Sequence, residues 1–327
     1  MKAQVLHQPG VLKLEDIPMP ECGDKQVLIK LITSCICNGS DPAIMAGAHW
    51  TDFPIVFGHE AYGVITACGS EVTGYEVGDR VAWWFTVGAF AEYVAVAPDD
   101  VAMVKLPSRI SNDEGPLFEL AGAAIRAVEA ARINPGDRVL IIGLGPSGVI
   151  MSQLAKQAGA STVIGWDLYE YRRQLGLELG CDGTFNNAIR SVSKEVIEQF
   201  GEMDIVIDAY ADDILPESPT LDDGIAVLRD GGTIISYGHP RRGRQLDIFH
   251  LQRKQVTMRG PVNDIQLVRQ YLQKAVDYAV QGKLRLAPLI SSRVPLDQVA
   301  EGLELVINHP DKYMKILVDI SSGEMSS

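Results

Sequence analysis

The chain has 327 residues, of which 46% are hydrophobic and 22% charged, and its formal net charge is −13. This composition is typical of a globular protein long enough for two domains, and it excludes a disordered chain. The acidic balance opposes contact with a phosphate backbone, so we expect no nucleic-acid partner. No apolar run reaches the length of a membrane span, so we expect no membrane partner either.

The cysteines and the N-terminal stretch indicate the compartment. MKAQVLHQPGVLKLED lacks the sustained apolar segment of a signal peptide. Five cysteines in a chain of this length are too few for a disulfide scaffold, and reducing conditions would keep them as free thiols. We therefore expect a cytoplasmic protein whose cysteines are buried or bind metal.

The hydrophobic pattern changes along the chain. Residues 1–115 consist of short β-branched and aromatic runs separated by glycine and proline, which predicts an antiparallel β region with few helices. From about residue 120 to 260, apolar strands such as RVLIIGLG and MDIVIDAYA alternate with helical stretches. This alternation predicts an α/β fold with a doubly wound parallel sheet of the Rossmann type. The tail adds an amphipathic helix in DIQLVRQYLQKAVDYAVQGK and a last strand in YMKILVDI.

Residues 34–42, SCICNGSDP, raise a question about their two thiols. Alternate side chains of an extended segment share a face, so Cys35 and Cys37 would point the same way. A redox pair, two small core residues and the first ligand of a metal site all fit this spacing.

A glycine-rich turn predicts a dinucleotide site. Gly143, Gly145 and Gly148 lie between a strand and a helix, and Asp167 ends the next strand about 20 residues on. The first glycine allows the tight turn, the second lets the backbone approach the pyrophosphate, and the third permits close packing of helix and strand. The helix N-terminus then favours the phosphate charge.

The cofactor is assigned to Gly143, Gly145, Pro146, Ser147, Gly148, Asp167 and Arg172. The Asp167 carboxylate would accept hydrogen bonds from ribose hydroxyls and repel a 2′-phosphate, so we predict NAD rather than NADP. Arg172 would either stack near the adenine or cap a solvated helix face.

Three residues far apart in the sequence offer metal ligands. Cys37, His59 and Glu119 carry a thiolate, an imidazole and a carboxylate, which would suit zinc with an open fourth position. A histidine in the sequence GHE is by itself more often a hydrogen-bonded structural residue. Spacing along the chain alone does not show that Glu119 lies near the other two residues.

Nearly the whole chain is similar to medium-chain dehydrogenases/reductases of the zinc alcohol dehydrogenase type. The resemblance rests on the segments CNGSD, GHEAYG, VGDRVA, GAFAEYV, ELAGAAIRAV, GDRVLIIGLGPSG and APLISSRVPLDQVAEGLELV. It implies a GroES-like β-barrel catalytic domain over residues 1–118 and 264–327, and a Rossmann NAD-binding domain over 119–263. It also implies one catalytic zinc per chain on Cys37, His59 and Glu119. The cysteine loop that holds a structural zinc in many relatives is missing, so no structural zinc is expected.

The resemblance also implies roles for residues around the metal. Ser40 would bind the reacting alcohol oxygen, Asp41 would orient the zinc histidine, and Glu60 would support the metal site from outside its ligands or approach the metal transiently. The substrate pocket would be lined by His49, Trp50 and Phe85. His49 is also a candidate for proton transfer, because Ala43 occupies the position of the family's usual relay histidine.

One departure concerns the first ligand. The family's common pattern has the cysteine three residues before the aspartate, whereas Asn38 is an extra residue between Cys37 and Asp41. A one-residue bulge would keep the Cys37 thiolate on the metal.

The implied activity is hydride transfer between NAD and an alcohol, secondary or polyhydroxylated, with zinc as Lewis acid and Ser40 as proton acceptor. Two alternatives are a zinc-free NAD(P)H-dependent enone or quinone reductase of the same superfamily, and a non-catalytic NAD-binding sensor or scaffold. The expected partners are a small alcohol or carbonyl compound and further copies of the chain. Family members commonly pair the edge strand matching QVTMRG across a dimer axis, so a homodimer or homotetramer is expected.

Overall fold

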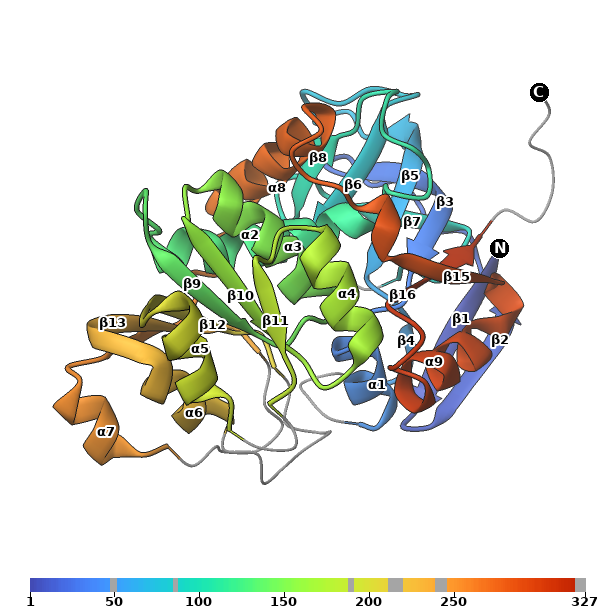
Figure 1. The fold of residues 1–327 in the computed structure, drawn as a ribbon. Coiled ribbons are helices and arrows are strands. Elements are labelled where there is room, and N and C mark those ends of the chain that lie inside the picture. Colours follow the sequence, from blue (N-terminus) through green and yellow to red (C-terminus); the bar gives the residue numbers. More distant parts are fainter. Residues whose placement is uncertain (48–51, 85–87, 188–190, 211–219, 239–245, 321–327) are drawn as a thin grey trace. The chain divides into compact units, whose positions relative to one another are not determined.

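The computed structural model describes residues 1–47, 52–84, 88–187, 191–210, 220–238 and 246–320 (Figure 1). The chain divides into two compact units. The first comprises Met1–Gly122, Asp264–Gly282 and Leu286–Ser327, and the second comprises Ala123–Asn263 and Lys283–Arg285. Among the described residues, no helix combines the length and the apolar character that a bilayer crossing requires.

The first unit is built mainly from antiparallel strands. A seven-stranded sheet has the order β15-β16-β3-β5-β6-β8 with β7 paired to β3, and a three-stranded sheet has the order β2-β1-β4. The strands are β1 (Lys2–Gln8), β2 (Val11–Asp16), β3 (Val27–Cys35), β4 (Ile55–Val56), β5 (Glu60–Cys68), β6 (Arg80–Trp84), β7 (Tyr93–Val96), β8 (Ala102–Lys105), β15 (Ile290–Pro295) and β16 (Lys315–Asp319). The last strand, β16, pairs with β3 and places Leu317 opposite Cys35, so the end of the chain completes the sheet that begins near its start.

Few helices accompany these strands, as the sequence predicts. They are α1 (Ser40–Met45), α8 (Ile265–Val280), α9 (Val299–Asn308) and the 3-10 turns η1 (Ala287–Leu289) and η2 (Leu296–Gln298), while α2 (Leu117–Ala131) continues from the first unit into the second. Asp264 is the N-cap of helix α8, and its side chain accepts hydrogen bonds from the N–H groups of Gln266 and Leu267. This cap satisfies donors that the first helical turn leaves unpaired.

The second unit contains a six-stranded parallel sheet with the order β11-β10-β9-β12-β13-β14. Its strands are β9 (Arg138–Ile142), β10 (Thr162–Trp166), β11 (Gly183–Phe185), β12 (Met203–Asp208), β13 (Leu228–Ser236) and β14 (Thr257–Arg259). Its other helices are α3 (Pro146–Gln157), α4 (Glu170–Glu178), α5 (Ser193–Phe200), α6 (Thr220–Val227) and α7 (Ile248–Arg253). The central strands are almost entirely apolar and buried, as expected for a sheet covered on both faces. The predicted doubly wound sheet is confirmed.

The strand order of this sheet locates a crevice. Strand β9 pairs with β10 on one side and with β12 on the other, so the order of connection reverses between β9 and β12. In doubly wound sheets, ligands bind beyond the carboxyl ends of the strands at this switch point. Strand β14 forms one edge of the sheet, and the predicted pairing of that edge across a dimer axis stays a prediction.

Candidate functional site

Ligand atoms of Cys37, His59 and Glu60 come together in the first unit. The Cys37 sulfur, an imidazole nitrogen of His59 and a carboxylate oxygen of Glu60 all lie within 4.8 Å of one another. Strand β3 ends at Cys35 and β5 begins at Glu60, and these two residues are opposite each other in the antiparallel ladder. The register of the sheet therefore brings Cys37, just past the end of β3, to the pair that opens β5.

The extra residue Asn38 is accommodated in a helical turn and not in the predicted bulge. The Asp41 N–H donates to the Cys37 carbonyl at 3.3 Å, and the Ser40 N–H donates to the Cys37 sulfur at 3.5 Å. In return, the Cys37 N–H donates to Oδ2 of Asp41 at 2.8 Å, across a separation of four residues. Because residues four apart are neighbours on a helical turn, this longer spacing still holds the thiol and the carboxylate together.

Asp41 also orients the imidazole of His59. Its Oδ1 lies 3.1 Å from Nδ1 of His59, and the Asp41 side chain is fully buried. An ionised carboxylate only accepts hydrogen bonds, so this contact favours a proton on Nδ1 and leaves Nε2 as the nitrogen for a metal, which would replace the Nε2 proton of the charged imidazole. Burial opposes the charged imidazole, but Asp41 and Cys37 outweigh it and raise the pKa of His59 well above its usual value. The predicted orienting role of Asp41 is consistent with this geometry.

Gly58 explains how His59 reaches this position. Its φ is +82°, in the left-handed region that favours glycine, and a Cβ at this residue would lie 2.7 Å from the ring of Phe90. The turn before β5 therefore requires glycine both for its backbone angle and for the packing of Phe90.

Glu60 has a partner that the sequence does not predict. Lys315, in β16, donates to Oε2 of Glu60 and to the carbonyl of Ile36, and both charged side chains are fully buried. Burial disfavours the ammonium, yet the Glu60 carboxylate beside it raises the pKa of Lys315 above its usual value. The sign in the sequence is a lysine at the start of the strand KILVD, directly before three apolar residues.

Cys35 differs from Cys37 in its surroundings. Its side chain is fully buried, and its Sγ donates to the Ile316 carbonyl at 3.3 Å. Burial raises the pKa of the Cys35 thiol well above its usual value, which keeps it protonated. Of the three interpretations of SCICNGSDP, the structure supports a core role for Cys35 and a ligand position for Cys37.

The donor set of the first unit fits a zinc ion. Thiolate, imidazole and carboxylate are the ligands of catalytic zinc sites. Oε1 of Glu60 and both amide atoms of Asn38 are buried and have no hydrogen-bond partner within the described ranges. An unpaired buried polar atom costs about 1–3 kcal/mol, and a cation beside Glu60 would offset that cost.

Within the described part of the chain, the structure does not bring the other predicted residues of this site into the group of ligand atoms. Glu119 lies in the first turn of α2 and is buried, but it is not a member of the three-residue group, so its role as third ligand stays a prediction. Ser40 is the first residue of α1, next to Asp41. His49, Trp50 and Phe85 lie outside the described residues.

The glycine-rich turn of the second unit has the geometry that the sequence predicts. Gly143 follows β9 with φ +90°, and a Cβ on Gly148 would lie 1.9 Å from the Gly143 carbonyl oxygen. A Cβ on Gly145 would meet nothing closer than Nη1 of Arg172, at 3.9 Å. The first and third glycines are therefore required by the fold itself, while the second leaves open space beside the turn.

Helix α3 begins at this turn with its N-terminus uncapped. The N-cap residue is Gly145, no side chain accepts a hydrogen bond from the first turn, and Pro146 has no N–H to satisfy. The N–H groups of the first turn and the helix dipole are thus directed at the space beside Gly145, as a phosphate site requires.

Asp167 lies directly after β10 and is tied to the glycine turn. Its Oδ2 accepts from the Leu144 N–H and its Oδ1 from the Tyr169 N–H, both at 2.9 Å. Burial raises the pKa of Asp167 above its usual value, while Arg172 and these two N–H groups oppose the shift. Each carboxylate oxygen keeps a second lone pair, so ribose hydroxyls can still donate to Asp167.

Arg172 packs into the same corner. Its Nη1 lies 3.8 Å from Oδ2 of Asp167, and its guanidinium lies 5.0 Å from the ring centre of Tyr169. Only 11% of its side chain is exposed, so Arg172 does not lie on a solvated helix face. Its role on the adenosine side of the predicted cofactor stays a prediction.

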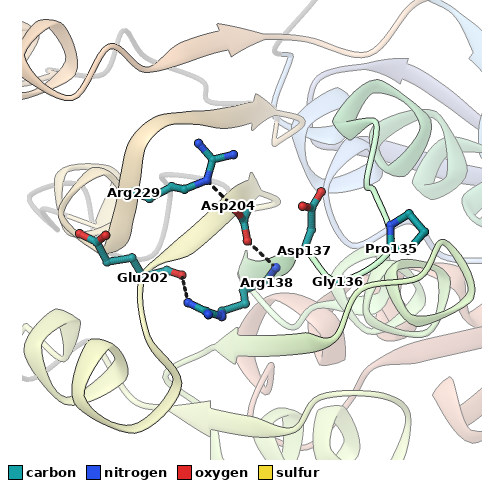
Figure 2. Close-up of a pocket in the computed structure, with 7 residues that line it drawn as sticks. All are labelled: Pro135, Gly136, Asp137, Arg138, Glu202, Asp204 and Arg229. Carbon is teal, nitrogen blue, oxygen red and sulfur yellow. Dashed lines mark hydrogen bonds and ion pairs between the residues drawn. The ribbon is translucent and has the colours of Figure 1, made fainter.

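Figure 2 shows a polar pocket at the other end of the parallel sheet. It lies at the amino ends of β9, β12 and β13, and it is lined by Pro135, Gly136, Asp137, Arg138, Glu202, Asp204 and Arg229. Arg229 donates to Oδ1 of Asp204 at 2.6 Å, and Arg138 donates through its backbone N–H to Oδ2 of Asp204 and through Nη1 to the Glu202 carbonyl. Arg229 and Asp204 form an ion pair here, and the pocket lies at the end of the sheet opposite the carboxyl ends where ligands of such sheets bind.

Comparisons with known proteins agree with both units. The family model for the alcohol dehydrogenase GroES-like domain matches residues 23–108, and the model for zinc-binding dehydrogenase matches residues 146–277. Sorbitol dehydrogenase of Rattus norvegicus is 29% identical over 339 residues, covering 92% of this chain and 91% of that protein.

Solved structures show the same fold. Galactitol-1-phosphate dehydrogenase from Escherichia coli has a TM-score of 0.86 at 23% identity, covering 98% of this chain and 100% of that one. A zinc-binding dehydrogenase of Sinorhizobium meliloti 1021 solved with NADP has a TM-score of 0.86 at 23% identity, with coverage of 98% and 99%. The predicted GroES-like domain is confirmed alongside the Rossmann sheet. The chain therefore belongs to the zinc-dependent medium-chain dehydrogenase/reductase superfamily of oxidoreductases, as its sequence motifs predict.

Proposed function

We propose that this protein is an NAD- and zinc-dependent alcohol dehydrogenase that interconverts a secondary or polyhydroxylated alcohol and its carbonyl. The observation that carries the proposal is the meeting of the Cys37, His59 and Glu60 ligand atoms within 4.8 Å. The names of relatives that act on sorbitol and galactitol-1-phosphate support a polyhydroxylated substrate.

Zinc, when bound, supplies Lewis acidity toward the oxygen of the alcohol. Cys37 and His59 would hold it together with a carboxylate, for which Glu119 is the predicted residue and Glu60 the one found beside them. Asp41 keeps the His59 proton on Nδ1 and holds the Cys37 backbone through a hydrogen bond of 2.8 Å. Ser40 Oγ would bind the alcohol hydroxyl and accept its proton.

The second unit would supply the cofactor site. The uncapped start of α3 favours a diphosphate, and Asp167 would accept hydrogen bonds from the ribose hydroxyls next to it. The nicotinamide, when bound, supplies the hydride chemistry, while the protein positions it.

The test measures zinc per chain by elemental analysis in the wild type and in Cys37→Ser, Glu119→Ala and Glu60→Ala. NAD reduction is measured on the same samples with a panel of secondary alcohols and polyols. We expect close to one zinc in the wild type and loss of both metal and activity in Cys37→Ser, because the thiolate is a ligand. The variant Cys35→Ala is the matched control, since this buried neighbour lies outside the ligand group and should keep its zinc.

Comparing Glu119→Ala with Glu60→Ala, the latter combined with Lys315→Met so that no buried charge is left unpaired, decides which carboxylate is the third ligand. A wild type without zinc that reduces enones with NADPH would overturn the proposal in favour of a reductase. Tight NAD binding with zinc present and no turnover of any alcohol would indicate a sensor instead.

The cofactor preference has its own test, the variant Asp167→Ser. Serine keeps an acceptor for one backbone N–H but removes the charge that would repel a 2′-phosphate, and it frees the neighbouring Arg172. We expect NAD affinity to fall about tenfold, the scale of a hydrogen bond to a charged group, and NADP affinity to rise. Isothermal titration with both cofactors measures this, with the exposed Asp230→Ser as control. An unchanged ratio of the two dissociation constants would contradict the role of Asp167.

A further inference from the structure

Two hydroxyl groups meet in the second unit beside the glycine-rich turn. Ser147 Oγ and Tyr237 Oη lie 3.0 Å apart, although the residues are 90 positions apart in the sequence. Ser147 belongs to the cofactor turn predicted from the sequence, but nothing in the sequence points to Tyr237.

Ser147 is the second residue of α3 and the first of that helix to carry an N–H. It follows Gly145 and Pro146, so its backbone N–H and its hydroxyl belong to the uncapped helix terminus. That terminus is where a diphosphate would lie.

Tyr237 comes directly after β13, and its backbone is fixed against the end of β12. The N–H groups of Tyr237 and Gly238 both donate to the Asp208 carbonyl, at 3.0 and 2.8 Å. A Cβ on Gly238 would lie 2.1 Å from the Tyr210 carbonyl oxygen, so the chain passes here in close backbone contact.

The glycine turn also packs against the residues that directly follow β12. A Cβ on Gly143 would lie 3.1 Å from the Ala209 carbonyl oxygen. Since β12 lies between β9 and β13 in the sheet, the Ser147–Tyr237 hydrogen bond crosses the carboxyl end of β12. It therefore spans the switch-point crevice from the helix side to the β13 side.

The direction of this hydrogen bond matters for an anion. A hydroxyl has one proton to donate and two lone pairs, and either oxygen of the pair can be the donor. If Ser147 donates to Tyr237, its proton is used and its oxygen would repel a phosphate. If Tyr237 donates to Ser147, the serine keeps its proton for the anion, and the chain of two hydroxyls is polarised cooperatively.

We infer that Tyr237 is a positioning residue that donates its hydroxyl proton to Ser147 and so directs the Ser147 hydroxyl to the diphosphate of the bound dinucleotide. This inference rests on the proposed function, because it needs a dinucleotide in the crevice. It assigns Tyr237 to the diphosphate and not to the nicotinamide or the adenine.

The experiment compares Tyr237→Phe, Ser147→Ala and the double variant in the full chain. Three probes are titrated calorimetrically: NADH, ADP-ribose, which has the diphosphate without the nicotinamide, and adenosine, which has no phosphate. We expect Tyr237→Phe to weaken the binding of NADH and ADP-ribose by about tenfold and to leave the binding of adenosine unchanged. The double variant should bind ADP-ribose no more weakly than Ser147→Ala alone, because tyrosine acts through serine.

Tyr93→Phe, which removes a tyrosine hydroxyl from β7 in the first unit, is the matched control and should bind all three probes as the wild type does. Unchanged ADP-ribose binding in Tyr237→Phe would overturn the inference, as would equal weakening of adenosine or additive losses in the double variant. A wild type that binds neither NADH nor ADP-ribose would instead overturn the proposed function itself.

Discussion

Lys315→Met is expected to lower the free energy of unfolding by about 3–5 kcal/mol, the usual cost of removing one partner of a buried ion pair. Lys315 and Glu60 are both fully buried, and the ammonium also donates to the Ile36 carbonyl at 2.7 Å. Methionine has a similar length but no charge, so the variant leaves the Glu60 carboxylate in the core without its cation. Chemical denaturation monitored by tryptophan fluorescence measures the loss.

Two further variants distinguish the effect of breaking the ion pair from the effect of replacing any lysine by methionine. Glu60→Gln combined with Lys315→Met should lose less than the sum of the single variants, because no charge is then left unpaired. Lys312→Met, three residues earlier and exposed, should stay within about 0.5 kcal/mol of the wild type. A decrease of less than about 1 kcal/mol in the free energy of unfolding of Lys315→Met would contradict the prediction that Lys315 and Glu60 form a buried ion pair.

Gly148→Ala and Gly145→Ala are both expected to weaken cofactor binding, but only Gly148→Ala should also destabilise the fold. A Cβ on Gly148 would lie 1.9 Å from the Gly143 carbonyl oxygen, which is backbone and cannot move aside without moving β9. We expect this variant to lose about 3 kcal/mol of stability, at the upper end for overpacking, and to lose cofactor binding with it. At Gly145 the nearest atom would be 3.9 Å away and the backbone is extended, so alanine fits the fold.

Gly145→Ala should therefore unfold like the wild type within about 0.5 kcal/mol but bind NADH at least about tenfold more weakly. Its methyl group would occupy the space through which the diphosphate reaches the start of α3. Thermal unfolding and NADH titration on both variants test the pair. Equal destabilisation of the two, or normal NADH binding in Gly145→Ala, would show that the open side of this turn is not the cofactor site.

Much of the architecture could be predicted because its signals are local. Apolar runs alternating with amphipathic helices predicted the parallel sheet, and the glycines at 143, 145 and 148 predicted its turn. In each case the constraint acts within a few residues: a positive φ at Gly143, or a carbonyl 1.9 Å from the Cβ that Gly148 lacks. Such constraints select residue types at their own positions, so they can be read without the fold.

The metal site was predictable only in part. Cys37, His59 and Asp41 lie in motifs, and the structure brings the first two together with Asp41 beside them. Whether Glu60 or Glu119 completes the set depends on where α2 begins relative to β5, which spacing along the chain does not specify. The helical turn that accommodates Asn38 is likewise a matter of three-dimensional hydrogen bonding, since a bulge would have served the same sequence.

By itself, then, the sequence determined the two kinds of sheet, the dinucleotide turn with Asp167 and the identities of Cys37 and His59 as ligand candidates. Only the tertiary structure decided that Lys315 neutralises Glu60 across 255 residues and that Tyr237 meets Ser147 across 90. The physical reason is that a buried charge or hydroxyl needs a partner of the right chemistry at hydrogen-bond distance. Many residues in the chain could supply that chemistry, and only the register of β16 against β3 and the strand order around β12 select which one does.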